Sequence, residues 1–151
     1  MPAHSEQKFL PYTAQQIYDL VADIDKYPEF LPWCVASRVK SRVADSNGGG
    51  AVVLADLVIG YKLIQERFTS RVILQPHQRI EVNYTEGPFK YLNNIWQFNA
   101  QNGGCLVDFA IDFEFKSRLL QKMIEPFFYE AVRRMVTAFE LRANKLYGGG
   151  K

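Results

Sequence analysis

The chain has 151 residues, which suits one domain with a substantial core but not two. A hydrophobic share of 48% with 14% aromatic residues excludes a disordered protein. The net charge is +2, but residues 116–151 hold eight Lys and Arg against three Glu, so the C-terminal part is basic. That region either forms a solvated helix face or meets an anionic surface such as lipid headgroups or RNA.

Cysteine usage and the absence of long apolar runs limit the location of the protein. Cys34 and Cys105 are far apart and belong to no CxxC or Cys/His pattern, which excludes a disulfide framework and a cysteine-rich zinc site. No apolar run approaches the ~20 residues that span a bilayer, and the first residues carry no secretory or mitochondrial address. We therefore expect a cytoplasmic protein that is at most peripheral to the inner membrane.

The N-terminal third is predicted to hold one strand and two short helices. Residues 3–10 form the strand, and Thr13 with Gln16 three positions later predicts a capped helix to about Ala22. A second helical turn starts at Asp23 and should end near residue 27, because Pro28 disfavours α conformation in the residue before it. Residues 27–34 then form a rigid, aromatic-rich loop, either a hydrophobic plug on the core or a gate over a ligand.

From Cys34 onward the sequence alternates with a period of two. Val35, Val39 and Val43 are predicted to face inward, while Arg38, Lys40 and Arg42 form a basic outer face. A Gly-rich turn over residues 45–50 follows. Turns at Gly60, at residues 75–76, at 86–88 and at 101–104 then separate strands over residues 51–59, 61–74, 78–85, 90–100 and 105–115. This regular spacing with no intervening helix predicts an antiparallel meander.

The inward faces of these strands are rich in aromatic and branched residues. In the last strand the alternation puts Asp108, Asp112 and Glu114 on the face opposite the apolar one. The apolar face of that strand and the facing residues of two earlier strands are Cys105, Val107, Phe109, Ile111, Phe113, Phe115, Trp96, Phe98, Ile64, Phe68 and Val72.

Apolar residues at spacings of three and four predict one long helix from Ser117 to about Tyr147. Ser117 is the expected N-cap, the glycines from Gly148 end the helix, and Pro126 should kink it. A strand, two short helices, a meander and a terminal helix together predict an α+β helix-grip fold. In that fold a curved antiparallel sheet wraps around the long C-terminal helix.

Such a fold leaves an apolar space between sheet and helix, where small hydrophobic molecules bind. The candidate ligand-binding residues are Phe30, Leu31, Trp33, Phe68, Tyr84, Phe89, Trp96, Phe98, Phe109, Phe113, Phe128, Val132 and Met135. A polar ligand head would need only one or two donors, for which Tyr84, Tyr91, Asn93 and Asn94 are equal candidates.

The sequence gives little support for catalysis. His4 and His77 have no neighbours that suggest a triad or a metal site, and no nucleotide, zinc-protease or nucleophile-elbow motif is present. We expect no enzymatic activity, no catalytic residue, no metal and no cofactor. A cyclase or dehydratase that relies on an acid or Tyr in the cavity is the enzymatic alternative.

Three segments carry a resemblance to a known family: residues 21–34 (VADIDKYPEFLPWC), residues 87–98 with their GPFKYL start, and residues 112–120 (DFEFKSRLL). They resemble the coenzyme Q-binding protein family of the START-like, or polyketide cyclase and dehydrase-like, superfamily. The resemblance implies one START-like lipid-binding domain over residues 1–151. It also implies binding of ubiquinone or a similar polyprenyl lipid, without catalysis, in support of respiration or quinone biosynthesis.

The same resemblance leaves a second function open. A bacterial branch of the family is described as a toxin that binds the large ribosomal subunit and blocks subunit association. The expected partners are therefore a polyprenyl lipid, with peripheral membrane contact, or the ribosome through the basic residues; DNA is not expected.

Overall fold

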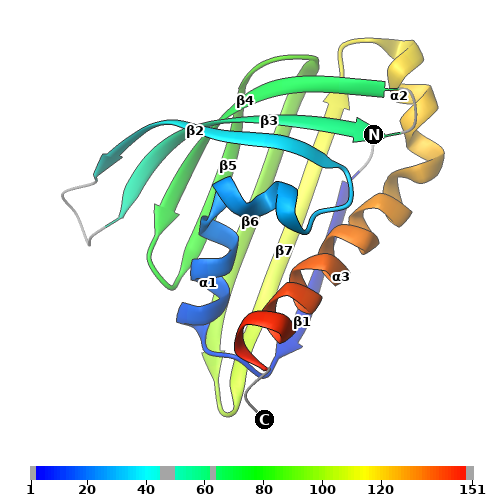
Figure 1. Cartoon of the computed structure of the whole chain (residues 1–151). Helices are drawn as coiled ribbons and strands as arrows, with labels where there is room; N and C mark the ends of the chain where they lie inside the picture. Colours follow the sequence, from blue (N-terminus) through cyan, green and yellow to red (C-terminus); the bar gives the residue numbers. More distant parts are fainter. Residues whose placement is uncertain (1–2, 45–49, 62–63, 149–151) are drawn as a thin grey trace.

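The computed structural model describes residues 3–44, 50–61 and 64–148, and the side chains of residues 61 and 64 are not described. It is a curved seven-stranded antiparallel sheet in the order β1-β7-β6-β5-β4-β3-β2, with the helices on one face (Figure 1). The predicted helix-grip architecture is confirmed. The elements are β1 (Ala3–Leu10), α1 (Ala14–Ala22), η1 (Ile24–Glu29), β2 (Cys34–Ala44), β3 (Ala51–Tyr61), β4 (Ile64–Gln75), β5 (Arg79–Glu86), β6 (Phe89–Gln101), β7 (Gly104–Phe115), α2 (Arg118–Ile124), η2 (Glu125–Phe127) and α3 (Phe128–Tyr147).

Helix α1 begins and ends where the sequence predicts. The Gln16 backbone N–H donates to Thr13 Oγ1 at 3.0 Å, and the Thr13 N–H donates to Gln16 Oε1 at 2.9 Å, which completes a capping box. The following 3₁₀ helix η1 continues to Glu29, beyond the predicted end near Tyr27. A short 3₁₀ turn tolerates Pro28 because it has few backbone bonds to lose.

The predicted meander is confirmed, with one turn displaced. Gly60 was expected at the turn between the second and third strands of the meander, but it lies within β3 and pairs with Gln65 of β4. The turn expected over residues 45–49 lies outside the described residues, as does the side chain of Ile64. A glycine is required at Gly87, where φ is +140° and an added Cβ would lie 2.7 Å from Phe68 Cβ.

Strand β2 does not follow the predicted alternation. Val35 and Val43 are 54% and 64% exposed, although an inward direction was expected for both. Register shifts between Cys34 and Ala36 and between Val39 and Ser41 interrupt the period of two. Instead, β2 is hydrogen-bonded to η1 through Ser37, whose Oγ donates to the Ile24 carbonyl at 2.8 Å. Arg38, Lys40 and Arg42 are exposed as expected, but they do not share one face.

The predicted terminal helix is divided at Pro126. Ser117 caps α2, accepting from the Leu120 N–H at 3.1 Å, and the 3₁₀ turn η2 joins α2 to α3. The expected kink is therefore confirmed as a short 3₁₀ segment. The C-terminal end of α3 contacts the start of α1, since the Tyr147 hydroxyl donates to the Gln16 carbonyl at 3.0 Å.

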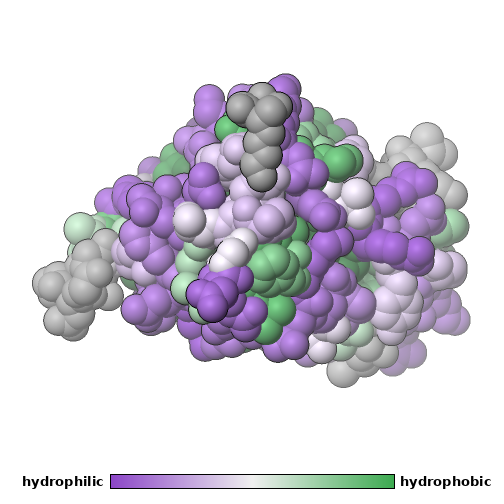
Figure 2. All heavy atoms as spheres, turned by 90° about the horizontal axis from the view of Figure 1, so that it is seen from below, coloured by the Kyte–Doolittle hydropathy of each residue, from purple (hydrophilic) through white to green (hydrophobic). Residues whose placement is uncertain are grey.

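The surface seen from below, where the β6–β7 turn and the C-terminal end of α3 lie, is mainly hydrophilic around a compact hydrophobic patch (Figure 2). Across the described residues, no helix is long and apolar enough to cross a membrane. Apolar side chains gather instead between sheet and helices, where the core includes Phe89, Trp96 and Phe139.

Candidate functional site

An apolar cavity of about 200 Å³ lies between the inner face of the sheet and the helices. Strands β3 to β7 form its floor, α2, η2 and α3 form one wall, and η1 with the loop after it forms another. Its surface is almost entirely hydrocarbon; the polar side chains on its walls include Glu66, Ser70 and Asn94. Such a space favours a ligand that is mostly apolar and carries few polar atoms.

The cavity volume sets the size of what it holds in this conformation. A protein cavity of about 150 Å³ accepts one benzene molecule. The 200 Å³ observed here therefore accepts one substituted ring or a short hydrocarbon segment. A long polyprenyl chain extends beyond it or requires the helices to move outward.

Most of the candidate residues lie on the cavity wall. The structure brings together Leu31, Trp33, Phe68, Phe89, Trp96, Phe113, Phe128, Val132 and Met135. The tight β5–β6 turn accounts for part of this convergence, because it places Phe89 beside two other rings. The centroid of the Phe89 ring lies 5.2 Å from that of Phe68 and 4.6 Å from that of Phe115.

The other four candidates point elsewhere. Phe98 packs on Tyr18 of α1, with ring centroids 5.9 Å apart, and Phe109 borders a separate small void beside α1. Phe30 packs against Phe139, centroid to centroid 5.2 Å, on the outer side of the loop. The Tyr84 hydroxyl accepts from the backbone N–H of Phe89 at 3.2 Å and is not part of the cavity wall.

Several wall residues are not among the ligand-binding candidates predicted from the sequence. Ile80 and Phe139 follow the strand and helix periods, so the patterns contained a signal for them. Ser70 and Glu66 share a face of β4 with Phe68, and alternation alone could have placed them there. Nothing in the sequence shows that a serine and a carboxylate border an apolar space.

The polar groups on the wall differ in how well they are hydrogen-bonded. Asn94 Oδ1 accepts from the Trp96 indole N–H at 3.0 Å, and Asn94 Nδ2 donates to the Ala110 carbonyl at 2.8 Å. By contrast, Ser70 Oγ and Trp33 Nε1 are buried and have no hydrogen-bond partner among the described residues. Native proteins contain few such groups, and each calls for an explanation.

Two ionisable groups on the wall have perturbed pKa values. Burial raises the pKa of the Cys34 thiol to about 11. Burial likewise raises the pKa of the Tyr27 hydroxyl, which donates to the Val21 carbonyl. Both groups are neutral at physiological pH, so neither is suited to act as a base or a nucleophile there.

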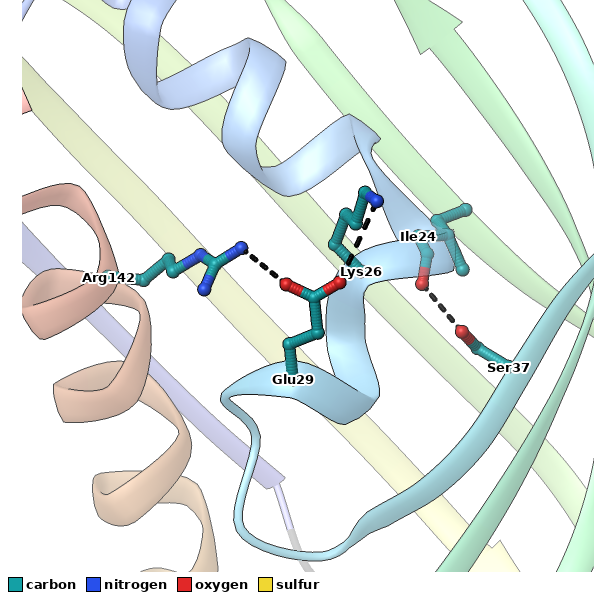
Figure 3. Close-up of polar contacts among 5 residues, drawn as sticks. All are labelled: Ile24, Lys26, Glu29, Ser37 and Arg142. Carbon is teal, nitrogen blue, oxygen red and sulfur yellow. Dashed lines mark hydrogen bonds and ion pairs between the residues drawn. The ribbon is translucent and has the colours of Figure 1, made fainter. Parts of the chain in front are cut away.

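Residues 27–34, which run from the end of η1 through the following loop to the start of β2, close one side of the cavity. Leu31 and Trp33 line the cavity, and the Trp33 carbonyl accepts from the Gly60 N–H at 2.9 Å. Figure 3 shows how η1 is held to α3: the Arg142 guanidinium donates to Glu29 at 2.9 Å, and Lys26 lies 3.7 Å from the same carboxylate. The loop thus packs on the core, as a plug would, and also covers the cavity, as a gate would.

The wall holds no histidine, and His4 and His77 lie outside it. Within the described part of the chain, no group of three or more His, Cys, Asp or Glu side chains is placed to hold a metal ion. The acids Asp108, Asp112 and Glu114 are absent from the cavity wall, as the alternation of β7 predicts.

A curved sheet that encloses an apolar cavity against a long helix defines a helix-grip protein of the START-like class. Comparison with known proteins agrees: the chain belongs to the family described as Polyketide cyclase / dehydrase and lipid transport, which matches residues 10–140. The family membership predicted from the sequence is confirmed.

Two curated relatives have different names. Ribosome association toxin RatA of Pseudomonas aeruginosa is 37% identical over 150 residues, covering 98% of this chain and 100% of that protein. Coenzyme Q-binding protein COQ10 homolog B, mitochondrial, of Xenopus laevis is 35% identical over 150 residues, covering 96% of this chain and 59% of that protein. Neither name describes an enzyme.

Solved structures show the same fold. An 18 kDa protein from Caulobacter crescentus has a TM-score of 0.79 and 36% identity, covering 98% of this chain and 99% of that one. A START superfamily protein from Mycobacterium smegmatis has a TM-score of 0.78 at 18% identity, covering 95% and 98%, and supports the fold alone.

Proposed function

We propose that this chain is a non-catalytic carrier of a hydrophobic ligand, most simply ubiquinone or a similar polyprenyl lipid, in support of respiration or quinone biosynthesis. The apolar cavity between the sheet and the helices is the observation that carries the proposal. The name of the Xenopus relative supports a quinone as the ligand. Neutral Tyr27 and Cys34 on the wall, with no histidine there, favour binding over turnover.

The energetics of burial favour a prenyl ligand over a polar metabolite. Each CH₂ transferred from water to an apolar site contributes ~0.8 kcal/mol, so one five-carbon isoprene unit contributes about 4 kcal/mol before ordering costs. Each further isoprene unit therefore adds a favourable burial contribution that a polar metabolite lacks.

Segment α2 provides a suitable contact with a membrane surface. Leu119 and Met123 are 71% and 47% exposed, and Lys116, Arg118 and Lys122 are exposed beside them. Exposed apolar side chains flanked by cations suit an anionic lipid surface. The next residues, Ile124 and Phe127, line the cavity, so a ligand would pass between membrane and cavity at this end.

Binding to the large ribosomal subunit is the second candidate function. The name of the Pseudomonas relative favours association with the ribosome, and a surface groove along α3 that includes Arg133, Arg134 and Lys145 offers cations for it. This function would depend on those cations and on Arg38, Lys40 and Arg42 of β2, and it would weaken steeply with added salt. The carrier function depends on the cavity instead.

The test of the carrier function is quinone binding by variants of α3. Val132 is 4% exposed and lines the cavity, so Val132→Asp introduces a carboxylate where solvation is lost. We expect its affinity for a short-chain ubiquinone, measured by fluorescence titration, to fall by about a hundredfold or more. Thr137→Asp places the same group on the exposed side of the helix and should bind as the wild type does.

Two further variants guard against a folding defect. Ala131→Phe fills the cavity with hydrocarbon and should block the ligand while α3 stays packed. Trp96→Ser opens the opposite wall and should also weaken binding. Unchanged quinone affinity in folded Val132→Asp and Ala131→Phe would rule out the cavity as the binding site.

A further inference from the structure

The inner face of the sheet holds two polar side chains at the same part of the cavity floor. Ser70 lies on β4 and Asn94 on β6, with β5 between them. In the strand register Val72 pairs with Val82 and Val82 with Asn94, so Ser70 is two strands across and two residues along from Asn94. Strand spacing and rise put their Cα atoms roughly 12 Å apart, and both side chains project toward the concave side.

Each of these side chains has unused hydrogen-bonding capacity. The Ser70 residue is 2% exposed, and its hydroxyl has no hydrogen-bond partner among the described residues. Asn94 is fixed by its bonds to Trp96 and Ala110, which use one of its two N–H donors and one acceptor lone pair. A fixed amide that keeps one free donor is preorganised for a ligand acceptor.

The other polar groups considered from the sequence do not offer this. The Tyr84 hydroxyl is engaged by the Phe89 N–H, while Tyr91 and Asn93 are opposite Glu114 and Asp112 and lie outside the cavity wall. The Trp33 indole, which has no hydrogen-bond partner among the described residues, lies at the opposite end of the cavity. The Trp33 carbonyl accepts from the Gly60 N–H, and Gly60 pairs with Gln65, five residues before Ser70 on β4.

We propose that Ser70 and Asn94 bind the polar ring of the ligand, donating to acceptor oxygens on opposite edges of one ring, with the hydrocarbon tail directed toward Trp33 and α2. The inference rests on the carrier function and specifies the orientation of the ligand in that site. The cavity volume agrees, since about 200 Å³ accepts one substituted ring and leaves a long tail to exit.

The orientation predicts opposite effects of Ser70→Ala on the empty and the loaded protein. An unpartnered buried hydroxyl destabilises the empty protein, so its removal should raise the melting temperature by about 2–4 °C. The same change should weaken binding of a two-isoprene ubiquinone by about five- to tenfold. Ser5→Ala, at an exposed position of β1, is the matched control and should alter neither property.

A second ligand separates this inference from the carrier function itself. Geranylbenzene has a comparable ring and tail but no oxygen, so Ser70→Ala should bind it as well as the wild type does. If Ser70→Ala binds the quinone normally, or lowers the melting temperature of the empty protein, the assignment of Ser70 is wrong although the carrier function stands.

Trp33→Phe tests the reverse orientation. Loss of quinone affinity in Trp33→Phe, with normal affinity in Ser70→Ala, would place the ring at the α2 end and overturn the proposal. A wild-type protein that binds neither the quinone nor geranylbenzene would overturn the carrier function and this inference together.

Discussion

Cys34 lies on the cavity wall, and burial raises the pKa of its thiol to about 11. Well below the ordinary thiol pKa of about 8.5, the thiol is protonated in both the folded and the unfolded chain, so its ionisation does not oppose folding. As the pH rises from about 9 to about 11, the unfolded chain releases this proton more readily than the folded one. The free energy of unfolding should therefore decrease over that range.

Substitution of Cys34 should reduce this alkaline loss of stability. We expect urea unfolding midpoints of wild type to fall between about pH 8 and about pH 10.5, and those of Cys34→Ala to fall less. The comparison uses the pH slope, because Ala also enlarges the cavity and lowers stability at every pH. Parallel slopes in the two proteins would show that Cys34 does not titrate as its burial requires.

Side-chain direction in β6 and β7 could be predicted from the sequence, but position along the cavity could not. Trp96 and Phe98 share a face, as do Phe109 and Phe113, and alternation places all four inward. Only Trp96 and Phe113 reach the cavity, because α1 packs over Phe98 and next to Phe109. Where a helix crosses a strand depends on tertiary packing, which the period of a single strand does not contain.

At the scale of elements, contacts between η1 and α3 help to hold residues 27–34 over the cavity. Arg142 bonds to Glu29 and its guanidinium lies 5.1 Å from the centroid of the Phe30 ring. Tyr27 and Phe30 both pack on Phe139 of the same helix. Arg142 on α3 therefore makes both an ion pair with Glu29 and a contact with the Phe30 ring.

Removal of the Arg142 charge should loosen this loop without disturbing the sheet. In Arg142→Met we expect amide hydrogen exchange in η1 and at Leu31, whose N–H donates to the Tyr27 carbonyl, to become about two- to fivefold faster. Arg134→Met is the matched control, because among the described residues the ion-pair partner of Arg134 is exposed Glu130 of the same helix. Equal exchange in the two variants would mean that Arg142 does not hold the loop.

Local signals predicted the elements best where tertiary contacts agree with them. The Thr13 capping box and the break at Pro126 have local causes, and both appear as expected. Strand β2 was predicted less well, because it is an edge strand whose register shifts and contact with η1 override its alternation. An apolar residue such as Val43 can remain exposed there, since β3 is the one strand among the described residues that pairs with β2.

For the whole molecule, the order of elements was sufficient to predict the helix-grip fold, whereas the size of the cavity depends on tertiary packing. Sheet curvature and helix placement together determine whether Phe68, Phe113 and Val132 fill the space between them or leave room for a ligand. Composition specifies the apolar lining but not a volume of about 200 Å³, nor the unpartnered hydroxyl of Ser70 within it.

The proposed carrier function requires that the cavity holds a polyprenyl quinone. Native mass spectrometry with organic extraction, on protein purified from a quinone-producing host, tests it most directly. We predict about one quinone per chain, consistent with a single preformed site. An empty protein that also fails to take up added short-chain quinone would contradict the claim and favour the ribosome-binding function.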